Sequence, residues 1–196
     1  MVDIMETLSQ GTYIVFDLET TGLSANEGDS IIEIGAVKIQ NGKIIDRFDE
    51  LIDPGKLLDK KITEITCITD EMLKGKPNEK DTVIKFMEWC GNYPMVAHNA
   101  RFDLSFMEMA YLKYDLGKLK NTVIDTLELS RALDQGFARH SLSALVKRYN
   151  VPWDEDAHHR ADYDAEGTAL VFAKMIKKMD NQHIEKIIII CYNYIA

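Results

Sequence analysis

The sequence is poor in the features that mark secreted, membrane-spanning and disulfide-stabilised proteins. Its cysteines, Cys67, Cys90 and Cys191, lie far apart and form no Cys-x-x-Cys pair, which argues against a disulfide framework or a structural zinc site. We expect free thiols in or near the core. The longest apolar run, 187–191, is well short of the roughly 20 residues that a membrane helix needs. The first ten residues lack the apolar stretch of a secretory signal, so we expect a cytoplasmic protein without a membrane partner.

A surplus of basic residues is also missing. The chain has 32 acidic against 23 basic residues, a formal net charge of -9 and a pI near 5.0. Because nucleic-acid binding is generally driven by basic surfaces that release counterions from phosphates, strong unaided DNA binding is not expected. If the substrate is a nucleic acid, divalent cations must offset part of the negative charge at the site. A partner protein would supply the remaining affinity for the nucleic acid.

The composition is that of one globular domain. Of the 196 residues, 46% are hydrophobic and 28% charged, with 4 prolines and 11 glycines, and a chain of this length can bury a single core. We expect an N-terminal extension at 1–10, a folded domain at 11–180 and a C-terminal segment at 181–196. For that last segment a helix, an edge strand and a surface that packs on a neighbour all remain open.

The residue pattern predicts an α/β fold. Runs of β-branched and aromatic residues predict strands at 13–17, 31–39 and 43–52, the second and third joined by a tight hairpin at Asn41-Gly42. The apolar first strand favours a central position. Apolar residues at helical spacing and two brief apolar runs predict the remaining elements: helices around 62–72, 83–90, 104–112, 126–133, 141–149 and 162–179, and strands at 95–97 and 123–124. Together they predict a mixed five-stranded sheet flanked by helices.

Paired acids close the first predicted strand. Asp17 and Glu19 are two residues apart, so their side chains point to the same side of a sheet. Hard divalent cations prefer oxygen ligands, and Mg²⁺ is often held by one or two carboxylates and a substrate phosphate. Taken alone, the tripeptide Asp17-Leu18-Glu19 is more typical of a solvated strand end with turn-forming acids.

Two later segments change the weight of this pair. The segments 16–22, 98–103 and 159–164 read FDLETTG, HNARFD and HRADYD. In this order they resemble the three motifs of the DEDDh (DnaQ-like) 3′-5′ exonuclease superfamily, and most of all the proofreading exonuclease domain of PolC-type DNA polymerase III. The segment 124–129 and the doublet 158–159 strengthen that likeness, which extends over residues 11–179.

The resemblance implies a fold, a metal site and a set of roles. The fold is ribonuclease H-like, which agrees with the predicted elements. Two divalent ions, Mg²⁺ or Mn²⁺, are implied; Asp17, Glu19 and Asp164 hold the first, Asp17 also reaches the second, and Asp103 completes the metal site by orienting the attacking water. One departure is Asp162, which stands where these domains commonly place an apolar residue.

A general base and a substrate pocket are implied as well. His159 is the candidate base, because an imidazole with a pKa near 6.5 can accept a proton at neutral pH, and we expect it on the loop that leads into the last helix. Residues expected to contact the nucleotide are Thr20, Thr21, Gly22, His98, Asn99 and Phe102. His98 and Asn99 fit a simple turn equally well, and Phe102 fits the core as well as a stacking platform.

These features predict an enzyme that removes nucleoside 5′-monophosphates from DNA 3′ ends, as in proofreading. Its expected partners are a single-stranded DNA 3′ end and a replicative polymerase or helicase. One alternative is a relative that trims RNA or oligonucleotides. The same five catalytic residues would cleave RNA: Asp17, Glu19, Asp103, His159 and Asp164. Another is an inactive module that binds nucleic acid, although that reading needs a broken metal site.

Overall fold

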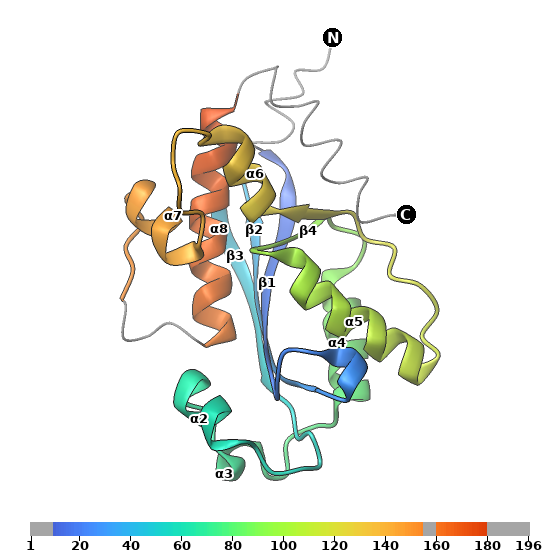
Figure 1. Ribbon diagram of the computed structural model, residues 1–196. Coiled ribbons are helices and arrows are strands. Elements are labelled where there is room, and N and C mark those ends of the chain that lie inside the picture. The colour runs from blue at the N-terminus through green and yellow to red at the C-terminus, as the bar shows by residue number, and fades with distance from the viewer. Residues whose placement is uncertain (1–9, 155–159, 180–196) are drawn as a thin grey trace.

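A mixed five-stranded sheet forms the centre of the protein. The computed structural model describes residues 10–154 and 160–179. Its strands follow the order β3-β2-β1-β4-β5, in which β1 pairs antiparallel with β2 and parallel with β4 (Figure 1). The strand bounds are β1 Thr12–Thr20, β2 Ile31–Gln40, β3 Lys43–Leu51, β4 Met95–Ala97 and β5 Val123–Asp125. The predicted sheet and the central position of the first strand are confirmed.

Helices connect and cover the strands. Their bounds are η1 Ala25–Glu27, α2 Lys60–Thr66, α3 Asp70–Leu73, α4 Glu79–Cys90, α5 Ala100–Tyr114, α6 Thr126–Leu133, α7 Leu142–Arg148 and α8 Ala161–Lys178. Several begin at a side chain that accepts a backbone N–H, as Asn78 does for α4 and Ser141 for α7, which satisfies donors that the first helical turn leaves unpaired.

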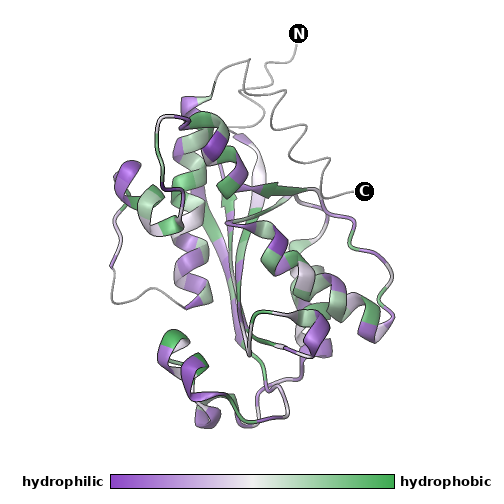
Figure 2. Cartoon of the chain, in the orientation of Figure 1, coloured by the Kyte–Doolittle hydropathy of each residue, from purple (hydrophilic) through white to green (hydrophobic). Residues whose placement is uncertain are grey.

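Both faces of the central strand are buried. Ile14 and Phe16 belong to the cluster that packs against α4 and α5, whereas Tyr13 and Val15 belong to the cluster with α6, α7 and α8. Because side chains alternate along a strand, burial on both faces explains why β1 reads as a continuous apolar run. In Figure 2 hydrophobic residues concentrate along the strands, and hydrophilic ones alternate with them on the surrounding helices.

The hairpin between β2 and β3 follows the predicted turn. Asn41 and Gly42 both have positive φ, 53° and 68°, as a two-residue hairpin of the primed type requires. The turn pairs Gln40 with Lys43, and a one-residue shift between Lys38 and Ile39 then sets the register in which Gly35 lies opposite Asp49, and Glu33 opposite Leu51.

Two predictions need correction. The first strand continues three residues past its predicted end at Asp17, because β1 stays paired with β2 as far as Thr20. Cys67 is exposed at the end of α2 and is not in the core, whereas Cys90 is buried as predicted. Cys191, with the rest of the predicted C-terminal segment, lies outside the described residues. Within the described residues, no helix is both long and apolar enough to cross a bilayer.

Candidate active site

The central strand places its two acids on the face that α8 covers. Asp17 and Glu19 lie inside β1, opposite Gly35 and Glu33 of β2. They share the side of Tyr13 and Val15, which pack under α8. The sheet therefore holds both carboxylates on its own rigid backbone.

Asp164 completes a three-carboxylate group with this pair. It lies in the first turn of α8, where the helix dipole favours a negative charge. One carboxylate oxygen from each of Asp17, Glu19 and Asp164 lies within 4.8 Å of the other two. An all-oxygen donor set of this kind suits a hard cation such as Mg²⁺ or Mn²⁺. The residues therefore fit the divalent metal that the sequence predicts.

Asp103 joins the group from α5. Its side chain is buried, and its Oδ1 accepts the backbone N–H of Leu18 at 3.1 Å. Within β1, only Ile14 and Val15 pair with the short strand β4. The rest of β1 therefore continues beyond β4 and reaches the start of α5. This hydrogen bond sets Asp103 beside the backbone between Asp17 and Glu19.

Burial and neighbouring acids raise the pKa of three of these carboxylates. Burial, followed by repulsion from Glu33, Asp164 and Asp103, raises the pKa of Glu19 to about 9. Burial also raises the pKa of Asp103 to about 8 and lifts the pKa of Asp17 well above its usual range. Without a cation the group therefore retains protons that its members would lose in water. A divalent ion would supply the missing positive charge.

Asp125 fixes the helix that carries Asp103. Its carboxylate accepts the N–H groups of Asn99 and Ala100 at 3.0 and 3.2 Å, and that of Leu127 at 2.8 Å. One side chain thereby caps the starts of both α5 and α6. An Asp directly before a helical pattern is a local signal for the α6 cap, whereas nothing local in the sequence indicates the link to Asn99.

His98 and Asn99 take structural positions at the end of β4. Asn99 has a φ of 63°, the left-handed conformation that Asn tolerates. His98 Nδ1 lies 3.0 Å from Thr126 Oγ1, and burial lowers the pKa of His98 to about 4, so its ring is neutral at pH 7. Their predicted contact with a nucleotide stays a prediction.

The loop after β1 is organised by Asp29, which the sequence reasoning missed. Asp29 Oδ1 accepts the Thr21 hydroxyl at 3.2 Å and Oδ2 accepts the Ser24 N–H at 3.0 Å. A Cβ on Gly22 would lie 2.2 Å from the same carboxylate, so a larger residue there would displace Asp29 from these contacts. The Thr20 hydroxyl donates to the Gly22 carbonyl at 2.6 Å. These contacts shape the loop, and its predicted role at the 3′ end stays a prediction.

Two further predicted residues have different outcomes. The Phe102 ring is partly buried, 5.1 Å from the Phe106 ring and packed against the core under α5, which agrees with the core reading and leaves stacking untested. His159 lies outside the described residues. The residue that follows it, Arg160, begins α8 as its N-cap.

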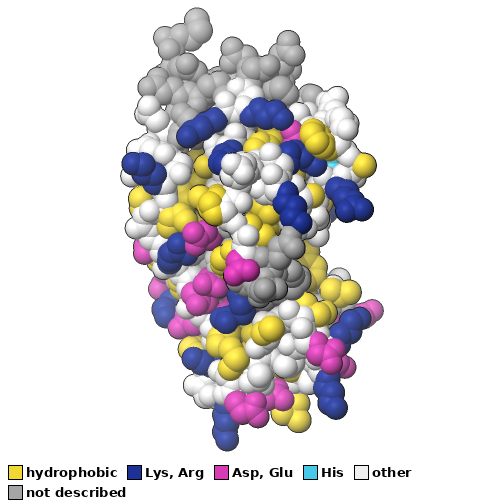
Figure 3. Space-filling model, turned by 90° about the vertical axis from the view of Figure 1, so that its left-hand side faces the viewer, with side chains coloured by type: hydrophobic (Ala, Val, Ile, Leu, Met, Phe, Trp, Pro, Cys, Tyr) yellow, Lys and Arg dark blue, Asp and Glu magenta, His cyan; other side chains and the backbone are white. Residues whose placement is uncertain are grey.

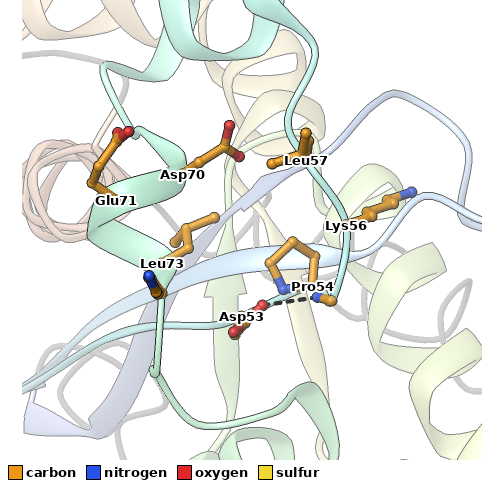
Figure 4. A pocket seen from close by; sticks show the side chains of 9 residues that line it. Asp53, Pro54, Lys56, Leu57, Asp70, Glu71 and Leu73 are labelled. Carbon is orange, nitrogen blue, oxygen red and sulfur yellow. Dashed lines mark hydrogen bonds between the residues drawn. The ribbon is translucent and has the colours of Figure 1, made fainter.

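An open cavity of about 500 Å³ lies away from the carboxylates. Figure 4 shows it between the segment that follows β3 and helix α3, with Leu57 and Lys56 on one side and Asp70 and Glu71 on the other. Asp53 at its base accepts the Gly55 N–H at 2.9 Å. None of the predicted site residues lines it, so the carboxylate group is a separate site.

The mixed five-stranded sheet with helices on both faces is that of ribonuclease H-like nucleases. The chain belongs to the exonuclease family, whose model (RNase_T, exonuclease) matches residues 14–172. It is a 3′-5′ exonuclease by class, and the predicted family is confirmed.

The chain is also similar in sequence to curated proteins of one kind, the PolC-type DNA polymerases III. The chain is 45% identical over 182 residues to the PolC-type DNA polymerase III of Staphylococcus epidermidis, and 46% identical over 172 residues to that of Staphylococcus aureus. The aligned region is 91% and 88% of this chain, respectively. In both cases the chain spans only 12% of the relative's length.

Solved structures share the fold. Exonuclease X in complex with 5′ overhanging duplex DNA superposes with a TM-score of 0.70 and 28% identity, over 89% of this chain and 98% of that one. The nuclease domain of 3′hExo, a DEDDh family member bound to rAMP, gives a TM-score of 0.73 over 86% and 92% of the two chains. At 15% identity the second likeness shows the fold alone.

Proposed function

We propose that this chain removes nucleoside 5′-monophosphates one at a time from DNA 3′ ends, with Asp17, Glu19, Asp103 and Asp164 holding two divalent cations. The observation that carries the proposal is the meeting of Asp17, Glu19 and Asp164 oxygens within 4.8 Å in a chain of the exonuclease family. These acids come from β1 and α8, which are far apart in sequence. A solvated strand end would not gather them on one half-buried spot.

The chain's own residues prepare the site for the reaction. When bound, the cations would activate the attacking water and stabilise the charge that develops on the phosphate and on the leaving 3′ oxygen. Asp17 and Glu19, fixed on the central strand, hold the metal site in place. Asp103, anchored through the Leu18 N–H, orients the water for in-line attack. His159 is the proposed base that takes the water's proton.

DNA is the proposed substrate, because relatives at 45% and 46% identity are DNA polymerases and a structure at 28% identity holds DNA. We also propose that the activity serves proofreading beside a replicative polymerase in the cytoplasm.

The surface charge agrees with DNA binding that a partner protein assists. On the face that α7 and α8 cover, Figure 3 shows Lys and Arg side chains in the upper part and a group of Asp and Glu side chains lower down. The net charge of -9 leaves the protein without a general attraction for DNA.

The test is digestion of a 5′-labelled single strand in Mg²⁺ or Mn²⁺, beside matched, mismatched and RNA strands. We expect a ladder that shortens from the 3′ end, release of nucleoside 5′-monophosphates, and no products in EDTA. Asp103→Asn should lose nearly all activity. Glu108→Gln changes an exposed acid on the same helix and should keep the wild-type rate.

Other outcomes of this digestion would contradict the proposed function or one of its residue roles. Intact strands in both metal and EDTA would indicate a module that binds without cleaving. Faster digestion of RNA than of DNA would assign the chain to RNA trimming. Equal rates for wild type and Asp103→Asn would remove Asp103 from the site.

A further inference from the structure

A buried acid interrupts the apolar strand β2. Glu33 stands between Ile32 and Ile34 and is completely buried. It lies directly opposite Glu19 in the sheet, so the two side chains share the face that α8 covers. A buried carboxylate needs strong partners to remain in such a position, and the partners of Glu33 come from the far end of the sequence.

The start of α8 supplies these partners. Arg160 Nε donates to Glu33 Oε1 at 2.9 Å and to Oε2 at 3.2 Å, and Arg160 Nη2 also donates to Oε1. The Ala161 backbone N–H donates to Glu33 Oε2 at 2.9 Å. Both carboxylate oxygens are therefore engaged by a guanidinium and by the first N–H of the helix. Since the N-cap residue Arg160 provides no side-chain cap, Glu33 acts as a cap from the neighbouring sheet.

The same contact leads directly to Asp164. The Arg160 carbonyl accepts the backbone N–H of Asp164 at 3.0 Å, so a fixed Arg160 fixes the first helical turn. Beside Glu33, Gly35 lets the helix approach the sheet very closely, because a Cβ there would lie 2.0 Å from the Asp162 nitrogen. Gly35 is also the partner of Asp17 across the sheet. The position of Asp164 relative to Asp17 and Glu19 thus depends on how α8 begins at Glu33.

Glu33 also belongs to a second group of acids, with Asp49 and Asp162. This group has its own cation in Arg160, whose guanidinium already engages Glu33. The group therefore belongs to the contact between Glu33 and the start of α8.

We propose that Glu33 is a positioning residue of the exonuclease site: through Arg160 and the Ala161 N–H it sets the first turn of α8 so that Asp164 meets Asp17 and Glu19 around a divalent cation. This inference rests on the proposed function for its catalytic consequence, but its effect on metal binding can be measured without a nucleic acid. Partners that orient metal ligands typically change metal affinity or activity by about 10- to 100-fold when they are mutated.

The experiment compares Glu33→Gln and Arg160→Lys with wild type. Gln keeps the size of Glu33 and an oxygen for the Ala161 N–H but loses the charge that binds Arg160. Lys keeps the charge but contacts one oxygen at a time. The matched control is Glu166→Gln, which breaks the half-exposed ion pair from Arg47 of β3 to Glu166 of α8 without touching the first turn. Mn²⁺ binding to each protein alone is followed by electron paramagnetic resonance, with kcat and KM on single-stranded DNA measured in parallel.

We expect Glu33→Gln to bind Mn²⁺ about 10- to 100-fold more weakly, to lose kcat in proportion at a fixed Mn²⁺ concentration, and to keep the KM for DNA. High Mn²⁺ should partly restore its kcat. Arg160→Lys should show a smaller effect of the same kind, and Glu166→Gln none. Arg160→Lys, which leaves Glu33 a cation, also serves as the test if Glu33→Gln does not fold by circular dichroism.

The outcomes separate the two proposals. Wild-type Mn²⁺ affinity and kcat in folded Glu33→Gln or Arg160→Lys would overturn the positioning role while leaving the proposed function intact. A wild type that binds Mn²⁺ but cleaves no DNA would overturn the proposed function, and the Mn²⁺ titrations would still decide the role of Glu33. A wild type that binds no Mn²⁺ would overturn both.

Discussion

The carboxylate group should destabilise the metal-free protein at neutral and alkaline pH, and Glu19→Gln should relieve this. Burial and the neighbouring acids raise the pKa of Glu19 from 4.5 to about 9. Between these values the folded chain holds a proton that the unfolded chain has lost. The free energy of unfolding therefore falls as pH rises through this window, by at most about 1.4 kcal/mol per pH unit for this group. At pH 7 the cost of Glu19 alone reaches about 3 kcal/mol.

A neutral Gln at this position keeps the shape of the side chain and cannot titrate. Because the remaining acids retain part of the repulsion, we expect Glu19→Gln to stabilise the metal-free protein at pH 7 by about 1–3 kcal/mol. That corresponds to a rise in Tm of roughly 2–10 °C for a domain of this size. The difference should shrink as the pH falls toward 4.5 and vanish below it, since Glu19 is then protonated in both states.

The assay is thermal unfolding by circular dichroism in EDTA from pH 5 to 8.5, for wild type, Glu19→Gln and the exposed control Glu108→Gln. Added Mn²⁺ should raise the Tm of wild type, and more so at higher pH because metal binding displaces protons. It should raise the Tm of Glu19→Gln much less. A wild-type Tm in EDTA that rises or stays flat from pH 5 to 8, or a Glu19→Gln protein no more stable than wild type at pH 7, would refute this reasoning.

The remaining predictions concern the supports of the site and its base. Gly35→Ala should destabilise the protein by about 1–3 kcal/mol and lower kcat, because its Cβ would meet the Asp162 nitrogen at 2.0 Å; denaturant unfolding with a wild-type midpoint would contradict the close approach. Asp125→Ala should cost roughly 2–4 kcal/mol, since three backbone N–H groups lose their acceptor, and unchanged hydrogen exchange at Asn99 and Ala100 would count against it. His159→Ala should retain Mn²⁺ binding yet slow hydrolysis by about 10² to 10⁴; an unchanged rate would place the base elsewhere.

Much of the sheet could be predicted because its signals are local. The β-branched runs and the Asn41-Gly42 turn are contained within a few residues, and each imposes its geometry on its own segment. The same holds for Asp17 and Glu19, whose shared side follows from the alternation of a strand. The extension of β1 to Thr20 was missed because it depends on pairing with Ile31 of β2, a contact that the polar residues after Asp17 do not indicate.

The supports of the candidate site could not be predicted, because they join residues far apart in the chain. Glu33 is one acid in an apolar run, and its partner Arg160 lies 127 residues later. Asp125 reads as a local helix cap, yet it also holds Asn99 across the ends of two strands. The family motifs mark acids that converge, but their spacing in sequence does not show what holds Asp164 in place.

The most direct test of the central claim is a crystal of the protein soaked in Mn²⁺, with the ion located by its anomalous scattering. We predict a peak in bonding contact with carboxylate oxygens of Asp17, Glu19 and Asp164. A peak between Glu33, Asp49 and Asp162, or no peak at the three predicted acids, would contradict it.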